Sequence, residues 1–562
     1  MKTLRNKMIV LMACVLCTVS CNDFLKEEAR GKLTTDVAFA QRSDVEGSVT
    51  TLYRQVSRSS FSLTNFVFAQ MGDDVSTHRA SNKASIRQWD QYKISTNNDR
   101  LLWSWEWRFK VIKAANFIIN GVEEAPAPQD EIDYALGQAH FWRAWAYYNL
   151  VCCFGPLPKV LSLDVDYEIG LSPVAEIFDL VVEDLKIAEQ KLPANYTDAL
   201  RSMNGVNVVM SKAGVQAMLS AVYLSMAGWP LNKGTEYYSL AAAEALKVID
   251  GSENGTYYYQ LYDEYWKIYS KQENWKNKES VCTLFFSYCD ELGDGSDIAR
   301  GGINDLLDVS QGWTDSRAEI GFWVDFPAGP RKTATYPEWT YNKNDKKVYR
   351  WWSNSLPDAD RTPYFGKSAF TKYGNEDEYD FTKGYEEQSN GWQDQIHQIV
   401  RLAEVYLFYA EALGRSGQTN ARAIDLLNKV RNRADGYGPV AVRPEGQNVY
   451  PATLSASELA EAAYTEHGWE VAGGYWGAAM PRANDLQRMN RMKDHFNKRK
   501  ADPEYVFTDP DTGEQVRVHE MFGVIEGDEW HESKMFAPYP SEEVERNPIF
   551  AMPVEEKLNM IY

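Results

Sequence analysis

A dense group of aromatic residues lies between positions 313 and 352, with charged residues interspersed. The aromatic residues are Trp313, Trp323, Tyr336, Trp339, Tyr341, Tyr349, Trp351 and Trp352, and the charged ones include Asp315, Arg317, Asp325 and Arg331. An exposed indole or phenol ring can stack on the apolar C–H face of a sugar ring, while carboxylate and guanidinium groups hydrogen-bond to its hydroxyl groups. This combination of residue types therefore suits carbohydrate binding.

Only part of this group can face a ligand, because tryptophan is highly buried on average. We expect half or more of the rings in the core, and in an extended segment one of Trp351 and Trp352 points inward and the other outward. The residues expected to contact a ligand are Trp313, Trp323 and Trp339, with Asp315 and Arg317 as polar partners. A second candidate is Trp89, which precedes Asp90, Asn97 and Asn98 in an expected loop before a helix at position 100.

Enzyme motifs give no support to a catalytic function. The chain has no G-x-S-x-G, P-loop, G-x-G-x-x-G or H-E-x-x-H sequence, and its histidines lack metal-ligand spacing. Acidic runs at 73–74, 290–297 and 509–514 could hold a structural calcium ion, but none matches an EF-hand loop, and a solvated acidic turn is the simpler interpretation. We therefore expect neither an enzyme nor a cofactor.

The first twenty residues have the order of a secretory signal peptide. Basic residues come first, an apolar stretch runs from 8 to 18, and small residues precede Cys21. The apolar stretch is about half as long as a membrane-spanning helix needs. We expect cleavage before Cys21 and lipid attachment to its thiol, which would hold the protein on a membrane. The alternative is ordinary cleavage near Ser20, with Cys21 as a plain thiol.

The balance of charge argues against nucleic acid as a partner. The chain has 59 Lys and Arg residues against 79 Asp and Glu residues, a formal net charge of −20, whereas phosphate binding needs clustered basic residues. Cys152, Cys153, Cys282 and Cys289 lack the spacing of a zinc or redox site. We expect the first two to be buried thiols, and a bridge between the last two stays open.

Helical periodicity dominates the first half of the chain. Apolar residues recur every three or four positions in 36–57, 100–120, 133–153, 173–191, 211–227 and 236–250. Residues 251–397 are instead rich in Gly, Asp, Asn, Trp and Tyr, which predicts loops with short strands or helical turns. Helices return at 398–416 and 420–434, and the part from 437 to 562 is loop-rich, with a helix near 455–470.

Small residues lie where these helices would touch, as in Ala144 with Ala146, Ala217 with Ala221, and Ala410 with Ala412. Small–large packing in helix hairpins is typical of tetratricopeptide arrays, although the spacing is irregular here. We therefore expect a mainly α fold, a tetratricopeptide-like superhelix interrupted by long loops.

Four segments of the chain match the sequence pattern of one known family, and they occur in the same order along the chain. They are Cys21-Asn-Asp-Phe-Leu with a helix ending near Tyr53, Gly137-Gln-Ala-His-Phe-Trp-Arg-Ala-Trp leading to Phe154-Gly-Pro-Leu-Pro, Val400-Arg-Leu-Ala-Glu with Ala423-Ile-Asp-Leu-Leu-Asn, and Pro538-Tyr-Pro-Ser-Glu-Glu. In these segments the chain resembles the SusD/RagB family of outer-membrane nutrient-binding lipoproteins. The segment from 465 to 488 departs from the family pattern, at residues thought to be structural.

The resemblance implies a signal peptide at 1–20 and one domain at 21–562, with about four helix pairs packed against a loop-rich part that holds the ligand. It implies that lipid on Cys21 holds the protein on the outer membrane, facing the cell exterior. The implied function is capture of an oligo- or polysaccharide for a partner, a SusC-like TonB-dependent transporter. Family ligand sites draw on the early loop around Trp89 and on the central loop region.

Two other functions stay open at this stage. A lipoprotein of the same architecture could capture peptides or act as an assembly scaffold, because helical arrays commonly bind proteins through a concave face. A glycoside hydrolase is the weaker alternative, since carboxylate pairs are too common in so acidic a chain to identify one. The sequence names no particular sugar.

Overall fold

The computed structural model describes most of the chain from residue 38 onward. The described residues are 38–60, 67–76, 84–164, 166–270, 272–286, 316–342, 347–367, 395–473, 478–519 and 528–562. Cys21, Cys289, Trp313 and Asp315 lie outside these residues, so the expectations placed on them stay predictions.

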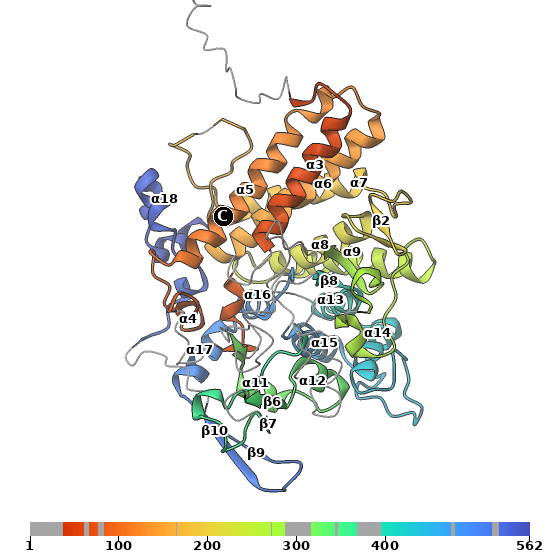
Figure 1. Cartoon of the computed structure of the whole chain (residues 1–562), viewed down its shortest axis with the longest axis vertical. Coiled ribbons are helices and arrows are strands. Elements are labelled where there is room, and N and C mark those ends of the chain that lie inside the picture. Colours follow the sequence, from red (N-terminus) through yellow and green to blue (C-terminus); the bar gives the residue numbers. More distant parts are fainter. Residues whose placement is uncertain are drawn as a thin grey trace, which may run out of the picture.

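A chain of packed helices builds the larger part of the molecule (Figure 1). Its members are α3 (Ser43–Ser60), α5 (Asp99–Ile119), α6 (Gln129–Phe154), α7 (Val174–Lys191), α8 (Lys212–Ala227), α9 (Thr235–Glu253), α13 (Leu402–Arg415), α14 (Ala421–Ala434) and α15 (Ala456–Val471). From α3 to α9 each helix packs against the next, α9 packs against α13, and α13 contacts α14 and α15. The prediction of a mainly α, tetratricopeptide-like fold is confirmed.

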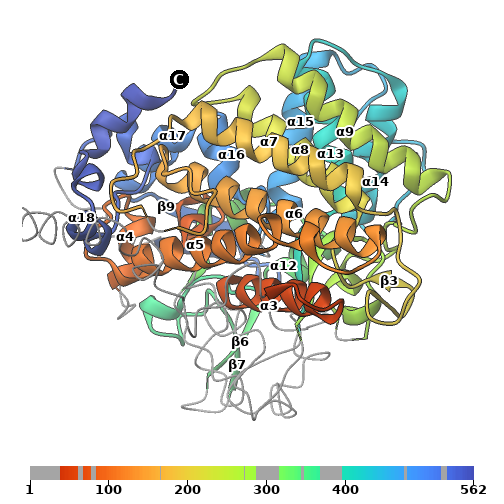
Figure 2. The same cartoon turned by 90° about the horizontal axis from the view of Figure 1, so that it is seen from above.

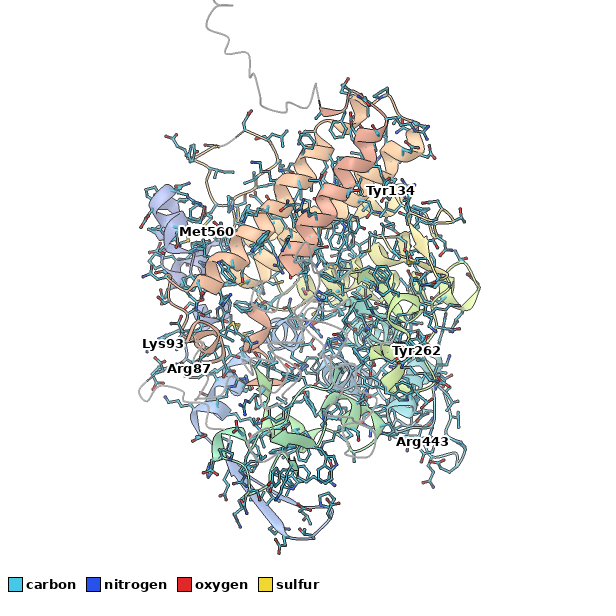
Figure 3. The ribbon with its side chains drawn as sticks, in the orientation of Figure 1. Arg87, Lys93, Tyr134, Tyr262, Arg443 and Met560 are labelled. Carbon is cyan, nitrogen blue, oxygen red and sulfur yellow. The ribbon has the colours of Figure 1, made fainter. Side chains whose placement is uncertain are left out.

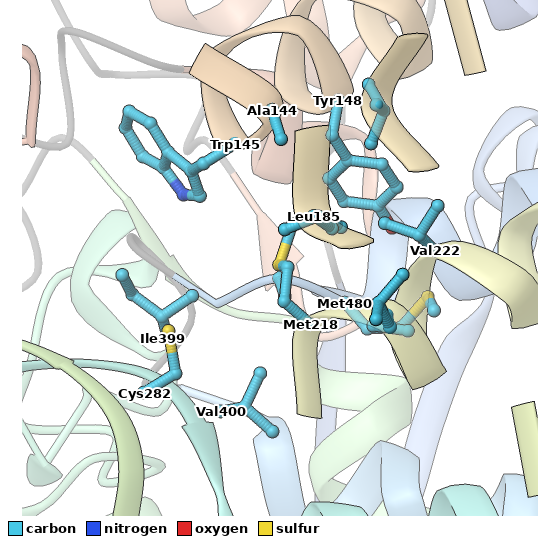
Figure 4. Packing of buried hydrophobic residues seen from close by; sticks show 14 of the residues in the cluster. Ala144, Trp145, Tyr148, Leu185, Met218, Val222, Cys282, Ile399, Val400 and Met480 are labelled. Atoms are coloured by element: carbon cyan, nitrogen blue, oxygen red, sulfur yellow. The ribbon is translucent and has the colours of Figure 1, made fainter. Parts of the chain in front are cut away.

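The apolar spacing of each helix explains how it packs. In α3, Val45, Val49, Leu52 and Val56 recur every three or four residues and are all buried, which gives the helix one apolar stripe. Helices α6 and α8 are instead buried on almost every side, so they run through the middle of the array. Figure 4 shows the junction of these helices with strand residues such as Ile399 and Val400 in the main core.

Two antiparallel strand pairs join parts of the chain that are far apart in sequence. Strand β1 (Val75–Ser76) pairs with β5 (Arg317–Ala318), and β4 (Ser280–Leu284) pairs with β8 (His397–Arg401). Because β8 runs directly into α13, the second pair ties the middle of the chain to the helical array. Cys282 of β4 is a buried free thiol, as are Cys152 and Cys153 of α6.

The middle of the chain folds a second, aromatic core at one end of the array. Its elements are α11 (Ile320–Asp325), α12 (Pro330–Thr335), the hairpin of β6 (Trp339–Asn342) with β7 (Lys347–Arg350), and the hairpin of β9 (Glu504–Thr508) with β10 (Gln515–His519). Trp323, Tyr336, Trp351 and Trp352 are buried in this core. In Figure 1 the two hairpins lie at the opposite end of the molecule from α3.

The remaining α-helices of the described chain are short. They are α4 (Ala84–Asp90), α16 (Arg482–Arg488), α17 (Met492–Lys500) and α18 (Ser541–Arg546). The last turn, Val554–Met560, returns to the array, where Lys557 donates a hydrogen bond to the carbonyl of Phe154 (2.9 Å); Figure 3 labels Met560 of this turn. Among the described residues, no helix combines the length and the apolar character that a membrane span requires.

A buried ionic cluster connects the two cores. We call it the Glu470 cluster; its members are Glu279, Arg331, Arg401, Arg433, Glu466 and Glu470. Glu470 accepts hydrogen bonds from three guanidinium groups, those of Arg331 (2.9 Å), Arg401 (2.7 Å) and Arg433 (2.6 Å). No side chain of the cluster is more than 2% exposed.

Charge pairing decides the ionisation of Glu470. Burial alone would raise the pKa of this carboxyl group, but the attraction of Arg433, Arg401 and Arg331 holds its pKa well below the usual range. The partners come from α12, β8 and α14, so both cores must form before these charges are neutralised. Breaking such a buried cluster by removing one partner leaves an uncompensated charge.

We predict that Glu470→Gln lowers the free energy of unfolding by roughly 3–5 kcal/mol, because three buried guanidinium groups lose their shared negative charge. Urea denaturation followed by circular dichroism measures the change. Glu461→Gln is the matched control on the same helix: its carboxylate is 48% exposed and pairs with Arg491 at the surface, so its expected effect is below about 1 kcal/mol. Equal losses in the two variants would contradict the role assigned to Glu470.

The same carboxylate should contribute to acid sensitivity. Its native pKa lies below the value of about 4.3 for glutamate in an unfolded chain, so its stabilisation is fully present above that value and is lost as the pH falls toward the native pKa. We expect the unaltered protein to lose stability more steeply than Glu470→Gln between about pH 5 and pH 3. The urea midpoints of both proteins, measured across this pH range, test the prediction. Parallel curves of midpoint against pH would disprove it.

Candidate functional site

The early candidate, Trp89, belongs to the main core and cannot meet a ligand. It lies on α4, where it is completely buried, and the neighbouring Asp90 pairs with buried Arg499 at 2.7 Å. Asn98 caps α5 by accepting hydrogen bonds from the backbone N–H groups of Arg100 and Leu101. The expectation of an exposed binding loop around Trp89 is therefore wrong, because a short helix folds there and turns the indole inward.

Trp323 is also a core residue, contrary to expectation. Its ring meets Trp351 edge-to-face, with the ring centroids 5.0 Å apart, and lies 5.1 Å from Phe507 of the β9–β10 hairpin. Lys332 covers it further, with Nζ 3.9 Å from the ring centroid. Trp351 and Trp352 are both buried because they occupy a turn after β7 rather than an extended strand, so the inward–outward alternation expected of them does not apply.

Arg317, expected to be a polar partner of the ligand, is part of the scaffold. It lies on β5 opposite Ser76 and is buried. Its guanidinium group pairs with Asp360 at 3.3 Å and lies 3.5 Å from the hydroxyl of Tyr364. Arg317 therefore holds the β1–β5 pair against the segment around Asp360.

Trp339 is the predicted aromatic residue that lies at the surface among those the structure describes. It is half-buried on β6 and faces Arg350 across the hairpin, whose guanidinium carbon lies 4.1 Å from the indole centroid. Arg350 pairs with Glu338 and with Asp511, to which it donates two hydrogen bonds of 2.9 and 2.6 Å. Figure 2 shows the β6–β7 hairpin at an edge of the molecule, away from α8 and α9.

We call this group of Glu338, Trp339, Arg350 and Asp511 the hairpin site. It combines one aromatic ring with a guanidinium group and two carboxylates, and both acids are already paired with Arg350. Arg350, Glu338 and Asp511 were not among the site residues predicted from the sequence. Arg350 could have been found from hairpin register, because it is the cross-strand partner of Trp339; Asp511 comes from a distant hairpin and had no such signal.

Two strand pairs bring together residues that flank the parts of the chain outside the described residues. Ser76 lies opposite Arg317, so the end of 67–76 meets the start of 316–342. Leu284 lies opposite His397, so the end of 272–286 meets the start of 395–473. Ser316, directly after Asp315 in sequence, is buried and accepts a hydrogen bond from Gln70 (2.7 Å).

The acidic runs considered for calcium have other partners where the structure describes them. Asp73 accepts two hydrogen bonds from Arg482, at 2.8 and 2.9 Å. Asp74 is buried, and that burial, with Asp73 beside it, raises the pKa of the Asp74 carboxyl group to about 7. Asp509 accepts a hydrogen bond from the indole N–H of Trp352 (2.6 Å). Within the described residues no group of three or more acidic, His or Cys side chains is arranged to hold a metal ion.

Comparison with known sequences identifies the chain over most of its length. A family model described as starch-binding and associating with the outer membrane matches residues 23–224, and the SusD family model matches residues 265–550. SusD-like protein P2 of Formosa agariphila is 24% identical over 77% of this chain and 82% of its own length. A SusD-like protein of Bacteroides ovatus is 22% identical over 98% of both chains.

Solved structures share the fold. A SusD homolog from Bacteroides thetaiotaomicron has a TM-score of 0.71 at 18% identity, covering 93% of this chain and 98% of its own. A structure with xylogluco-oligosaccharide has a TM-score of 0.66, and a laminarin-binding SusD-like protein one of 0.64; each is 18% identical and covers 91% of this chain and 98% of its own. Since the SusD family model alone matches more than half of its residues, the chain belongs to the SusD family.

Proposed function

We propose that this protein binds an oligo- or polysaccharide at the cell surface and delivers it to a SusC-like TonB-dependent transporter. The observation that carries the proposal is the match of nearly the whole fold to proteins named for laminarin binding and for a complex with xylogluco-oligosaccharide. The family models, which together extend from residue 23 to residue 550, point the same way.

The hairpin site is the part of the described surface whose chemistry suits this function. Trp339 offers an indole ring at the surface, and Arg350 beside it is held in place by two carboxylates. A ring fixed in this way can stack on a sugar face with little loss of conformational freedom, while the charged groups around it can bond to hydroxyl groups. Trp313 and Asp315 lie outside the described residues and stay predictions from the sequence.

The pairing of both acids at this site with one guanidinium group fits a binding function without catalysis. A glycosidase needs one carboxylic acid as a proton donor and one carboxylate as a base or nucleophile, placed on either side of the bond that breaks. Glu338 and Asp511 instead share one guanidinium group, that of Arg350. Both acids are therefore bound to one side chain rather than placed on either side of a substrate bond.

Attachment to the outer membrane through lipid on Cys21 completes the proposal. The leader ends in a cleavage pattern before Cys21, and the described chain offers no helix suited to span a membrane. One cysteine carrying more than one acyl chain gives stable attachment, because each buried CH₂ group adds to membrane affinity.

We predict that Trp339→Ala weakens glycan binding about tenfold, since loss of a stacked aromatic ring removes roughly 1 kcal/mol or more. Calorimetry with laminarin and xylogluco-oligosaccharides, and affinity electrophoresis on a wider polysaccharide panel, measure the effect. Trp103→Ala is the matched control, because Trp103 is 37% exposed on α5 with Arg100 stacked 4.2 Å from its ring. Equal binding by both variants would exclude Trp339 from the site, and binding to peptides but to no glycan would contradict the proposed function.

We also predict that Cys21→Ser prevents incorporation of labelled palmitate and releases the protein from the membrane fraction, since serine offers no thiol for the lipid. Cell fractionation and metabolic labelling provide the measurement. Cys17→Ser, a change within the same leader, should leave both results unaltered. If the Cys21→Ser protein stays lipidated and membrane-bound, the anchor lies elsewhere.

A further inference from the structure

The loop that follows α14 presents an aromatic ring to solvent and holds it in place. Tyr437 is 40% exposed, and the guanidinium carbon of Arg443, from the same loop, lies 4.7 Å from the centroid of its ring. The hydroxyl of Tyr437 donates a hydrogen bond to the carboxylate of Glu445, which lowers the pKa of that carboxyl group. Two neighbouring groups therefore fix the ring while part of it stays exposed.

Side-chain amides hold the loop itself in one conformation. Arg443 donates a hydrogen bond through Nε to Asn432 (2.8 Å), a buried residue of α14, and its backbone N–H donates one to the side chain of Asn448 (3.0 Å). Asn432 also donates to the carbonyl of Val440 (2.8 Å), and Asn448 donates to that of Ala441 (2.7 Å). A loop held in this way has little conformational freedom left to lose when a ligand binds.

A second aromatic segment lies against this loop. A Cβ at Gly438 would be 3.9 Å from the carbonyl oxygen of Asp263, so the loop meets the start of the short helical turn Tyr265–Tyr269. Trp266 of this turn is half-buried, and its position along the chain puts its Cα atom at most about 22 Å from that of Tyr437. The two rings are thus close enough for one short stretch of a glycan chain.

Charged groups surround the indole as they surround the phenol ring. The indole N–H of Trp266 donates a hydrogen bond to Glu264 (2.8 Å), and Lys267 pairs with both Asp263 (2.9 Å) and Glu264 (3.0 Å). The side chains of Asp263 and Glu264 are 68% and 48% exposed, so they can accept hydrogen bonds from a ligand. Figure 3 shows Tyr262, which precedes Asp263, on the same side of the molecule as Arg443.

We call this group the Tyr437 surface; its members are Asp263, Glu264, Trp266, Tyr437, Arg443 and Glu445. It repeats the composition of the hairpin site, an aromatic ring beside a guanidinium group and paired carboxylates. We propose that the Tyr437 surface is a second binding site for the glycan and that this glycan is uncharged. The inference rests on the proposed function, since it names a further site and the class of sugar for the same ligand.

The balance of charge favours an uncharged glycan. The Tyr437 surface has three carboxylates against one guanidinium group, and the hairpin site has two carboxylates against one guanidinium group. The whole chain carries a formal net charge of −20. Sulfate or uronic acid groups would meet like charges at both sites, whereas neutral hydroxyl groups can donate hydrogen bonds to the carboxylates.

Two sites on one protein favour long chains over single sugars. When one stretch of a polysaccharide is bound at the hairpin site, binding of a further stretch at the Tyr437 surface becomes intramolecular. The second contact then adds to retention even if its own affinity is low. The two sites together therefore select an extended, uncharged polysaccharide.

Substitution of the exposed ring tests the second site. We expect Tyr437→Ala to weaken binding about three- to tenfold, because a stacked ring is lost, and Tyr437→Phe to keep most of the affinity, because the ring stays. Tyr167→Ala is the matched control, since Tyr167 is 69% exposed on another loop. Calorimetry of the full chain with laminarin and xylogluco-oligosaccharides gives the affinities, and thermal unfolding checks that each variant is folded.

Footprinting locates the glycan without any substitution. Hydroxyl-radical labelling read by mass spectrometry should show lower reactivity of Tyr437 and Trp266 when the glycan is bound, with that of Tyr167 unchanged. On affinity gels we expect retention by uncharged polysaccharides and none by sulfated or uronic-acid polysaccharides.

The outcomes separate this inference from the proposed function. Glycan binding that Tyr437→Ala leaves unchanged, without protection of Tyr437, would overturn the second site and leave the proposed function intact. Strongest binding to a sulfated or uronic-acid glycan would overturn the assignment of an uncharged ligand. Loss of peptide binding or of transporter association in Tyr437→Ala, with glycan binding unchanged, would assign the surface to a protein partner instead. Absence of binding to every glycan would contradict the proposed function itself.

Discussion

Three buried guanidinium groups share one carboxylate at the centre of this fold. Glu470 can be ionised in the interior only because Arg331, Arg401 and Arg433 all reach it, and each arginine needs that charge in return. Removing each of these four charged groups from water costs several kcal/mol. Only closely placed opposite charges and well-formed hydrogen bonds offset that cost. The array and the aromatic core therefore cannot slide against each other without leaving a charge unpaired.

A second ionic group repeats this principle nearby. Asp485 on α16 accepts hydrogen bonds from Arg482 and Arg488 and is bonded to the ring of His467. Despite burial, the interactions with His467, Arg488 and Arg482 hold the pKa of Asp485 well below its usual range. Both groups draw on residues between 465 and 488, so this segment carries much of the buried charge of the described chain.

The helical array could be predicted from sequence because long helices carry a repeated signal. The apolar residues of α3 recur over several turns, and α6 and α8 are apolar on all sides, so element type and burial follow from the pattern. The aromatic core carries no such signal. Its elements are only four to six residues long, and its rings are buried by partners from far along the chain, as Trp323 is by Phe507.

The same reason explains why the surroundings of the candidate site residues could not be predicted from the sequence. Trp89 and Trp323 look in sequence like loop tryptophans, and only tertiary packing shows that their short helices turn inward. Arg317 looked available for a ligand because its partner Asp360 lies 43 residues further on. Trp339 lies half-buried on β6, and the neighbours that orient it, Glu338 aside, come from the opposite strand and from another hairpin.

The strand pairs β1–β5 and β4–β8 have a consequence for the order of folding. Each pair joins stretches that are far apart in sequence: helices α4 to α9 lie between β1 and β5, and α11, α12 and the β6–β7 hairpin lie between β4 and β8. Formation of either pair closes a long loop of the chain, and the entropic cost of loop closure rises with loop length. Contacts between neighbouring helices of the array close shorter loops, so we expect the helices to assemble before the strand pairs join.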